Sequence, residues 1–231
     1  MELFYTATDP EEFFELPGEE SKHITRVLRL SNGDELFLTN GKGTLYKAII
    51  ENTDSGICKV KIIEQTPGYG KRSYHLHIGI APTKNTDRFE WFLEKATEIG
   101  IDEITPLICR RSERKEVKPE RLNKVMISAI KQSIQTYLPV LNPTASFNEI
   151  LMQTGSSTKF ICSMDAEKSL KEICHVHENV FLLIGPEGDF HPDEMKAALE
   201  AGFRPASLGN RRLRTETAGV FACASIATIN Q

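Results

Sequence analysis

The first third of the chain alternates apolar and polar residues over short stretches. In CKVKII, residues 58–63, Val60 and Ile62 follow lysines, as expected for a strand that buries one face. Asn40-Gly41, which lies between two other such stretches, is a common hairpin turn. The pattern predicts three consecutive strands: DELFLTN at 34–40, TLYKAII at 44–50 and CKVKII at 58–63.

A polar segment rich in turn residues, TPGYGKR at Thr66 to Arg72, follows these strands and predicts a linker. We therefore expect two domains, a small β-barrel over residues 1–70 and a second domain over 71–231. Strand-like and helix-like stretches alternate in the second domain, which predicts an α/β fold with a parallel sheet. Its strands are expected at 74–81, 103–109, 160–165 and 180–185, and its helices at 85–100, 118–139, 192–202 and 215–229.

The composition is that of an ordinary soluble protein, with 40% hydrophobic and 26% charged residues and no apolar run as long as a membrane span. The five cysteines form no CxxC pair, and their odd number argues against a disulfide framework. We therefore expect a cytoplasmic protein.

The formal net charge of −4 is unevenly distributed. Residues 1–20 hold seven acidic residues and no lysine or arginine, whereas residues 22–61 hold seven basic residues against four acidic ones. The net charge therefore does not exclude a nucleic-acid partner.

Two glycine turns are the strongest candidate ligand-binding features. LLIGPEGDF at 182–190 runs from an apolar strand into glycine, and SLGNRRLRTETA at 207–218 contains a second turn. Glycine lets backbone N–H and C=O groups approach a small ligand closely. No GxGxxG fingerprint is present, and taken alone the turns could equally be simple connections.

The last expected helix, 215–229, is rich in Gly, Ala and Ser. Small side chains allow another backbone to approach closely, which predicts either tight packing within the chain or the interface of a homodimer.

These motifs, taken together, resemble the RsmE family. IGPEGDF and LGNRRLRTETA are similar to its paired C-terminal signature, and upstream matches are HITRVLR at 23–29, Lys84 with Arg88 and Glu90, and KATEIG at 95–100. Members of this family are SPOUT-class methyltransferases that methylate N3 of a uridine in 16S ribosomal RNA. The resemblance covers nearly the whole chain.

The resemblance implies a PUA-like RNA-binding barrel over 1–70 and a SPOUT trefoil-knot methyltransferase domain over 71–231. It also implies a homodimer that acts on 16S rRNA within the small ribosomal subunit, with S-adenosylmethionine as cofactor and no metal. The implied cofactor-binding residues are Met164, Leu183, Gly185, Pro186, Glu187, Gly188, Leu208, Gly209, Leu213, Thr217 and Ala218.

Two residues beside the second turn are candidates for the chemistry. Methylation of N3 requires its proton to leave and places negative charge on O2 and O4 of the base. Arg214 suits stabilisation of that charge, and Glu216 could orient the arginine or accept the proton. The alternatives are an ordinary salt bridge and a carboxylate at a helix start.

HITRVLR and its neighbours are the candidate RNA contacts. On α-helical spacing, Lys22, Arg26 and Arg29 share one face and Ile24, Val27 and Leu28 another, so the segment is either a phosphate-binding surface or a solvated amphipathic helix. The pairs His75/His77 and His175/His177 raise a metal hypothesis, but no plausible remaining ligands accompany them. The expected RNA-binding residues are Lys22, His23, Arg26, Arg29, Lys84 and Arg88.

Five positions depart from the family pattern. Asp189 replaces a glycine, His191 a Ser/Thr helix cap, Arg212 an aliphatic residue, and Lys131 and Gln135 a Glu and an Arg. The last pair leaves RNA contacts from that helix open. Two other functions are also considered: a SPOUT methyltransferase acting on tRNA, and a non-enzymatic RNA-binding factor in ribosome assembly.

Overall fold

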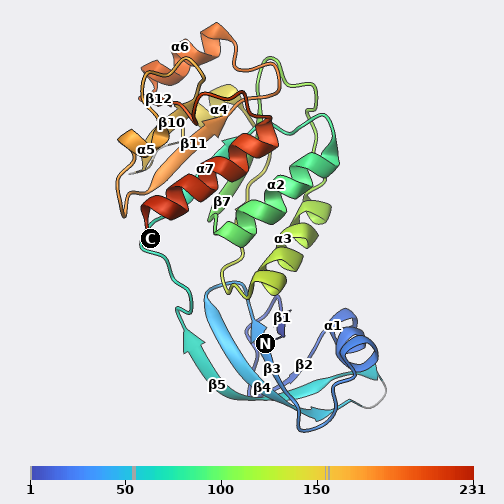
Figure 1. The fold of residues 1–231 in the computed structure, drawn as a ribbon. Coiled ribbons are helices and arrows are strands. Elements are labelled where there is room, and N and C mark those ends of the chain that lie inside the picture. Colours follow the sequence, from blue (N-terminus) through green and yellow to red (C-terminus); the bar gives the residue numbers. More distant parts are fainter. Residues whose placement is uncertain (1, 54–55, 154, 156) are drawn as a thin grey trace. The chain divides into compact units, whose positions relative to one another are not determined.

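The computed structural model describes residues 2–53, 56–153, 155 and 157–231. The chain forms two compact units (Figure 1). The first comprises Met1–Lys71 together with Ile127–Leu138, and the second Arg72–Met126 together with Pro139–Gln231. The segment Ile127–Leu138 thus packs with the first unit, although the sequence pattern assigned all of 71–231 to the second domain.

The first unit contains a curled five-stranded sheet with the strand order β1-β3-β4-β5-β2. Strand β1 runs parallel to β3, and the remaining neighbours are antiparallel. The three predicted strands are confirmed as β3, β4 and β5, whereas the short β1 and β2 were not foreseen. The strands are β1 (Leu3–Tyr5), β2 (Phe13–Glu15), β3 (Glu35–Thr39), β4 (Thr44–Asn52) and β5 (Lys59–Pro67).

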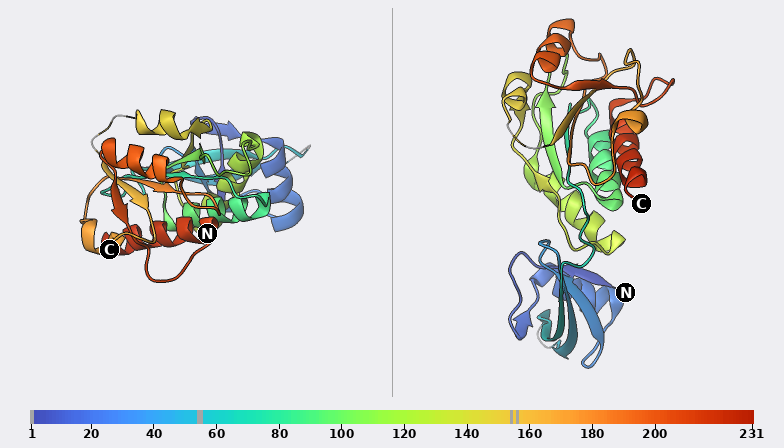
Figure 2. Two further views of the ribbon diagram at one scale, coloured as in Figure 1. Left: turned by 90° about the horizontal axis from the view of Figure 1, so that it is seen from above. Right: turned by 90° about the vertical axis from the view of Figure 1, so that its left-hand side faces the viewer.

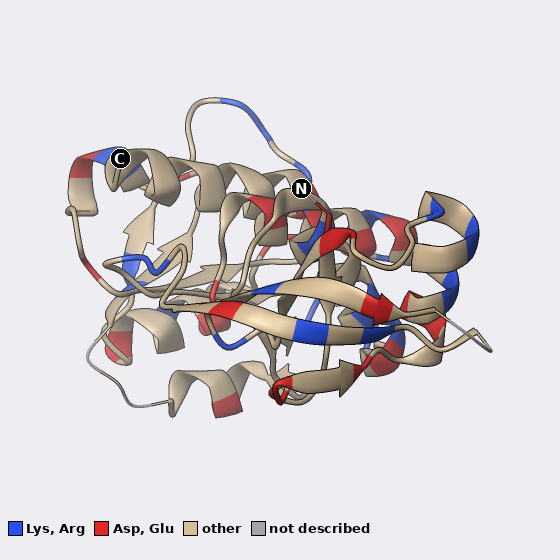
Figure 3. Ribbon diagram, turned by 90° about the horizontal axis from the view of Figure 1, so that it is seen from below, with Lys and Arg blue, Asp and Glu red and all other residues tan. Residues whose placement is uncertain are grey.

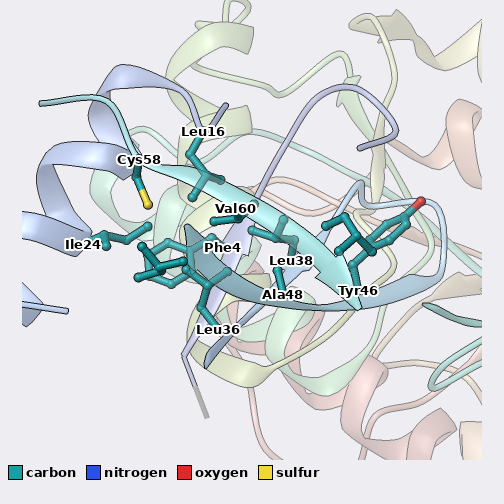
Figure 4. Packing of buried hydrophobic residues seen from close by; sticks show 11 residues of the cluster. Phe4, Leu16, Ile24, Leu36, Leu38, Tyr46, Ala48, Cys58 and Val60 are labelled. Atoms are coloured by element: carbon teal, nitrogen blue, oxygen red, sulfur yellow. The ribbon is translucent and has the colours of Figure 1, made fainter. Parts of the chain in front are cut away.

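The inner face of this sheet carries the core of the first unit (Figure 4). Leu36, Leu38 and Val60 are fully buried there, because alternate residues of each strand point to the same face. Gly43, in the turn between β3 and β4, has a φ of +96°, and a Cβ at this position would lie 2.2 Å from the ring of Tyr137. The turn therefore requires glycine at this position, because the positive φ disfavours other residues and because there is no room for a Cβ.

The segment around HITRVLR is helical, but not as a single α-helix. Helix α1 (Gly18–Lys22) continues into the π-helix η1 (His23–Leu28), which ends at Arg29 with a left-handed φ of 56°. The wider π-helical turn changes which residues share a face. Ile24 is buried but Val27 is 64% exposed, so these residues do not share one face as α-helical spacing predicted.

Helix α3 (Pro119–Ser133) is shorter than the predicted helix 118–139. Ile134 adopts a left-handed conformation with a φ of 56°, and this ends the helix. The residues that follow pair with the turn after β3: Gly43 N–H donates to Thr136 O at 2.8 Å, and Leu138 N–H donates to Gly41 O at 2.9 Å. These bonds make the segment an integral part of the first unit.

Two departures from the family pattern lie near the end of α3. Lys131 Nζ donates to both carboxylate oxygens of Glu20, at 2.6 and 2.8 Å, and lies 5.7 Å from the ring centroid of Phe4. Gln135 donates from its side chain to Ser133 Oγ at 3.2 Å. Lys131 therefore has a structural partner inside the first unit.

The second unit contains a seven-stranded sheet with the order β12-β10-β11-β6-β7-β8, in which β9 also pairs with β7. All of its strand pairs are parallel, which confirms the predicted α/β fold. The strands are β6 (Leu76–Ile80), β7 (Glu103–Ile108), β8 (Val140–Leu141), β9 (Ala145–Ser146), β10 (Thr158–Cys162), β11 (Val180–Ile184) and β12 (Arg204–Ala206).

Helices cover both faces of this sheet, with α2 and α7 packed together on one face and α4 and α6 on the other (Figure 2). Helices α2, α6 and α7 match the predicted ones. The short elements β8, β9, β12, α4 and α5 were missed, because a few residues show no periodicity. The helices are α2 (Thr86–Ile99), α4 (Phe147–Leu151), α5 (Leu170–Ile173), α6 (Pro192–Glu200) and α7 (Thr215–Ile229).

Local chemistry sets the ends of the helices. Asn85 accepts a hydrogen bond from Asp87 N–H at the start of α2, and Gly100 ends this helix with a φ of +115°. His191 caps α6 in place of Ser or Thr: its Nδ1 accepts from Asp193 N–H at 3.2 Å, while Glu194 Oε2 accepts from His191 N–H at 2.8 Å.

The small residues of α7 allow close packing within the chain. A Cβ at Gly219 would lie 2.5 Å from the ring of Phe92 on α2. Phe221 on α7 and Trp91 on α2, in contrast, are 48% and 41% exposed. Within the described residues, no helix is long and apolar enough to cross a membrane.

Candidate functional site

A cavity of about 410 Å³ lies where β10, β11 and β12 end. Loops leave the carboxyl ends of all three parallel strands there, the usual position of ligand sites in open α/β sheets. The cavity therefore joins the two glycine turns that the sequence singled out. Its lining consists of Cys162, Ser163, Met164, Ile184, Gly185, Pro186, Glu187, Asp189, Leu208, Gly209, Arg211, Arg212, Leu213, Thr215 and Ala218.

The loop Gly185–Phe190, which follows β11, is a tight turn. Asp189 N–H donates to Pro186 O at 2.9 Å, and Asp189 adopts a left-handed φ of 61°. Asp189 therefore keeps a backbone conformation that glycine adopts most easily, and its carboxylate accepts from Phe190 N–H at 2.7 Å.

Neighbouring elements hold this loop at several points. Thr215, the first residue of α7, donates from Oγ1 to Gly185 O at 3.0 Å. Arg111 donates to Gly188 O at 2.9 Å, and Lys84 N–H donates to Glu187 Oε1 at 3.2 Å. Sequence reasoning missed Thr215 and Arg111. Thr215 belongs to the matched TETA stretch, so proximity to the motif was the one signal that pointed to it.

The turn after β12 provides another wall of the cavity. Gly209 has a φ of +112°, and its N–H donates to Ser207 Oγ at 3.1 Å. At the end of the neighbouring strand β10, desolvation, with a smaller contribution from Asp189, raises the pKa of the Cys162 thiol to about 12. Cys162 is therefore a neutral thiol at physiological pH, and this part of the wall carries no thiolate.

The structure brings most of the predicted cofactor residues to the cavity. Leu183 instead points into the hydrophobic core, Gly188 packs beside Arg111, and Thr217 is a half-buried residue of α7 outside the lining. The predicted residues that line the cavity are Met164, Gly185, Pro186, Glu187, Leu208, Gly209, Leu213 and Ala218.

The two predicted catalytic residues lie outside this lining. Arg214 is exposed and immediately precedes α7. Glu216 is buried, its Oε1 lies 3.9 Å from Arg88 Nε, and its Oε2 has no hydrogen-bond partner in the part of the chain that the structure describes. The structure therefore pairs Glu216 with Arg88 of α2.

The basic residues fall into separate groups. Lys22, His23, Arg26 and Arg29 are exposed on α1 and η1. Lys84 is exposed too, and its ammonium forms a 2.9 Å ion pair with Glu113 that raises the pKa of the lysine. Figure 3 shows a further basic segment, the loop between β12 and α7, which arches away from the helix.

His77, of the first histidine pair, contacts neighbouring side chains of the sheet. His77 is buried, its Nε2 lies 2.8 Å from Thr105 Oγ1, and its ring stacks on that of Phe181 with centroids 4.2 Å apart. No group of three or more potential metal ligands occurs among the described residues.

Known proteins match both units. A family model described as an RNA methyltransferase domain matches residues 71–227, and one described as an RNA methyltransferase PUA domain matches residues 16–63. A curated relative from Mesomycoplasma hyopneumoniae, named ribosomal RNA small subunit methyltransferase E, is 28% identical over 96% of each chain.

Solved structures extend the similarity to the entire fold. A probable rRNA-methyltransferase from Porphyromonas gingivalis is 41% identical, with a TM-score of 0.94 over 100% of this chain and 98% of that one. A ribosomal RNA small subunit methyltransferase E from Neisseria gonorrhoeae, bound to S-adenosyl methionine, is 28% identical, with a TM-score of 0.91 over 100% and 98% of the two chains.

Proposed function

The chain belongs to the RsmE family of ribosomal RNA methyltransferases, and we propose that it transfers a methyl group from S-adenosylmethionine to N3 of one uridine in 16S ribosomal RNA. One observation carries the proposal. The two motifs that resemble the family signature, although separate in the sequence, line a single cavity at the carboxyl ends of the parallel strands.

The residues of this cavity fit S-adenosylmethionine. The cofactor combines a flat adenine, a sulfonium and an amino-acid end, which call for apolar surface and backbone hydrogen-bonding groups. Leu208, Leu213 and Met164 supply apolar surface, and the two glycine turns supply backbone groups. The volume of about 410 Å³ lies within the range usual for small-molecule sites.

In the proposed reaction, bound S-adenosylmethionine supplies the methyl group, and the protein orients the base and stabilises charge. Arg214, exposed at the start of α7, offsets negative charge that develops on O2 and O4 of the uracil ring. The buried carboxylate of Glu216 holds Arg88 near the same end of α7, in the orienting role that the sequence suggested for it.

We assign RNA binding to exposed basic residues and to the half-buried Arg88. Lys22, His23, Arg26 and Arg29 would contact phosphates from a PUA-like domain over 1–70, and Lys84 and Arg88 would contact RNA from a methyltransferase domain over 71–231. Such contacts position the RNA without reading its sequence. The same proposal places the protein on the small ribosomal subunit in the cytoplasm.

We also propose a homodimer and a trefoil knot at the C-terminus. The exposed aromatic rings of Phe221 and Trp91, on the packed helices α7 and α2, support a partner subunit on this face. The placement of β12 beside β10, with α7 returning to α2 and β6, supports the knotted path.

Mass spectrometry of ribosomal RNA tests the function. Deletion of the gene is expected to remove N3-methyluridine from 16S rRNA, and the parent gene is expected to restore it. Arg214→Ala is expected to slow single-turnover methyl transfer by roughly a hundredfold or more, while cofactor affinity stays unchanged. If the deletion strain keeps the methylation of its 16S rRNA but loses a methyl group from tRNA, the proposed substrate is wrong. If the methylation of both RNAs is unchanged, the proposed activity is wrong.

A further inference from the structure

The loop after β7, Cys109–Arg114, contributes nothing to the lining of the cavity, but its backbone is well fixed. Cys109 N–H donates to Ser112 Oγ at 2.9 Å, and Ser112 N–H donates to Cys109 O at 3.0 Å. Both residues are buried. The loop is therefore a closed turn on a buried base, from which longer side chains extend.

One of these side chains, Arg111, contacts the Gly185–Phe190 loop directly. Its Nη1 donates to Gly188 O at 2.9 Å and to Phe190 O at 3.3 Å. These carbonyls flank Asp189, whose left-handed backbone is sparsely populated for residues other than glycine. The guanidinium of Arg111 thus bonds to the loop on both sides of Asp189, the residue with the left-handed backbone.

A second side chain of the same turn supports the loop through Lys84. Arg114 donates from Nε and Nη2 to Lys84 O, at 3.2 and 3.0 Å. Lys84 N–H in turn donates to Glu187 Oε1 at 3.2 Å. The turn after β7 therefore reaches the Gly185–Phe190 loop along two routes, of which the one through Arg111 is direct.

We propose that Arg111 is a positioning residue that holds the Gly185–Phe190 loop in its cofactor-binding conformation without touching the cofactor. This inference rests on the proposed function, because it takes the cavity to be the S-adenosylmethionine site. Hydrogen bonds from a charged donor are stronger than neutral ones. Loss of the guanidinium leaves two carbonyls without their donor and releases the conformation of Asp189.

Calorimetric titration of the cofactor-free protein with S-adenosylmethionine tests the inference. Arg111→Ala is expected to weaken binding by roughly tenfold to a hundredfold, the effect of losing charged hydrogen bonds. Arg111→Lys keeps the charge but lacks the planar fork, so partial recovery is expected.

The neighbouring arginine provides a matched control. Arg110 lies on the same turn, but its guanidinium bonds to the start of α6, to the Asp193 carboxylate at 3.0 Å and to His191 Nδ1 at 3.3 Å, rather than to the carbonyls of the Gly185–Phe190 loop. Arg110→Ala is therefore expected to leave cofactor affinity at the parent value. Hydrogen exchange adds a readout without cofactor: amides 187–190 are expected to exchange faster in Arg111→Ala than in Arg110→Ala.

Kinetics separate positioning from a general loss of structure. With Arg111→Lys, the KM for S-adenosylmethionine is expected to rise while kcat at saturating cofactor stays near the parent value. Equal cofactor affinity in the parent, Arg111→Ala and Arg111→Lys would overturn the role of Arg111. Absence of binding by the parent protein would instead overturn the proposed function, so the two failures are distinguishable.

Discussion

His77 is predicted to make the stability of the second unit depend on pH in the acidic range. The ring is buried against Phe181, and desolvation lowers its pKa from 6.5 to about 4. Glu103 opposes this shift and His75 adds to it, but both contribute less than desolvation. His77 is therefore neutral in the folded protein at pH 7 and remains so at pH 5.

The direction of the effect follows from the two protonation equilibria. The unfolded chain binds a proton at this ring below about pH 6.5, whereas the folded protein resists protonation until about pH 4. The stabilising contribution is complete above pH 6.5 and is lost as the pH falls toward 4. A difference of about 2.5 pKa units corresponds to about 3 kcal/mol, of which about 2 kcal/mol is lost by pH 5.

Denaturant unfolding at pH 7.5 and pH 5 measures this loss. Trp91 is the single tryptophan and lies on α2, so its fluorescence reports on the second unit. His77→Phe, which can keep a ring stacked on Phe181, is expected to lose about 2 kcal/mol less than the parent between the two pH values. His175→Phe, a change at an exposed histidine of the same unit that does not act on His77, serves as the control. An equal loss in the parent and His77→Phe, or an NMR titration of His77 near pH 6.5, would refute the reasoning.

Three further experiments probe separate contacts. Thr215→Val removes the donor to the loop after β11 and is expected to weaken S-adenosylmethionine binding several-fold by calorimetry, from a loss of about 1 kcal/mol; unchanged affinity would contradict this. Gly43→Ala combines a positive φ with a clash against Tyr137 and is expected to destabilise the first unit by about 2 kcal/mol or more, so a melting temperature equal to that of the parent would count against it. A double-mutant cycle on Lys131 and Glu20, measured by denaturant unfolding, is expected to give a coupling of about 1–3 kcal/mol, and a value near zero would mean that the ion pair adds nothing.

Most of the long helices and strands were predictable because their own residues carry the signal, as alternation of apolar and polar positions or as helix caps. Strands β3, β4 and β5 show alternation, and α2 begins at Asn85 and ends at Gly100 through caps that sequence alone identifies. The end of α3 was not predictable, because the left-handed Ile134 lies within an apparently continuous helical pattern. The π-helical turn that exposes Val27 was not predictable either, because the sequence pattern there is that of an ordinary α-helix.

In the candidate site, too, the residues with a local sequence signal were predictable and the others were not. The two glycine turns were found from the sequence, since glycine near a strand end is a local signal, and their convergence followed from the family resemblance. Thr215 and Arg111 act through hydrogen bonds to a loop far away in the sequence. No local sequence pattern marks a residue whose hydrogen-bond partner is distant in the sequence, so only the structure identifies these two.

The segment Ile127–Leu138 also bears on how the chain is made. Synthesis proceeds from the N-terminus, and domains commonly fold as units as they emerge. The first unit is incomplete at Lys71, since Thr136 and Leu138 supply hydrogen bonds to its turn and Lys131 forms an ion pair with Glu20. We therefore expect the first unit to reach its full stability only after Leu138 has emerged from the ribosome. A nascent chain that has exposed Lys71 but not Ile127 is therefore expected to be sensitive to protease, and one that has also exposed Leu138 to be resistant.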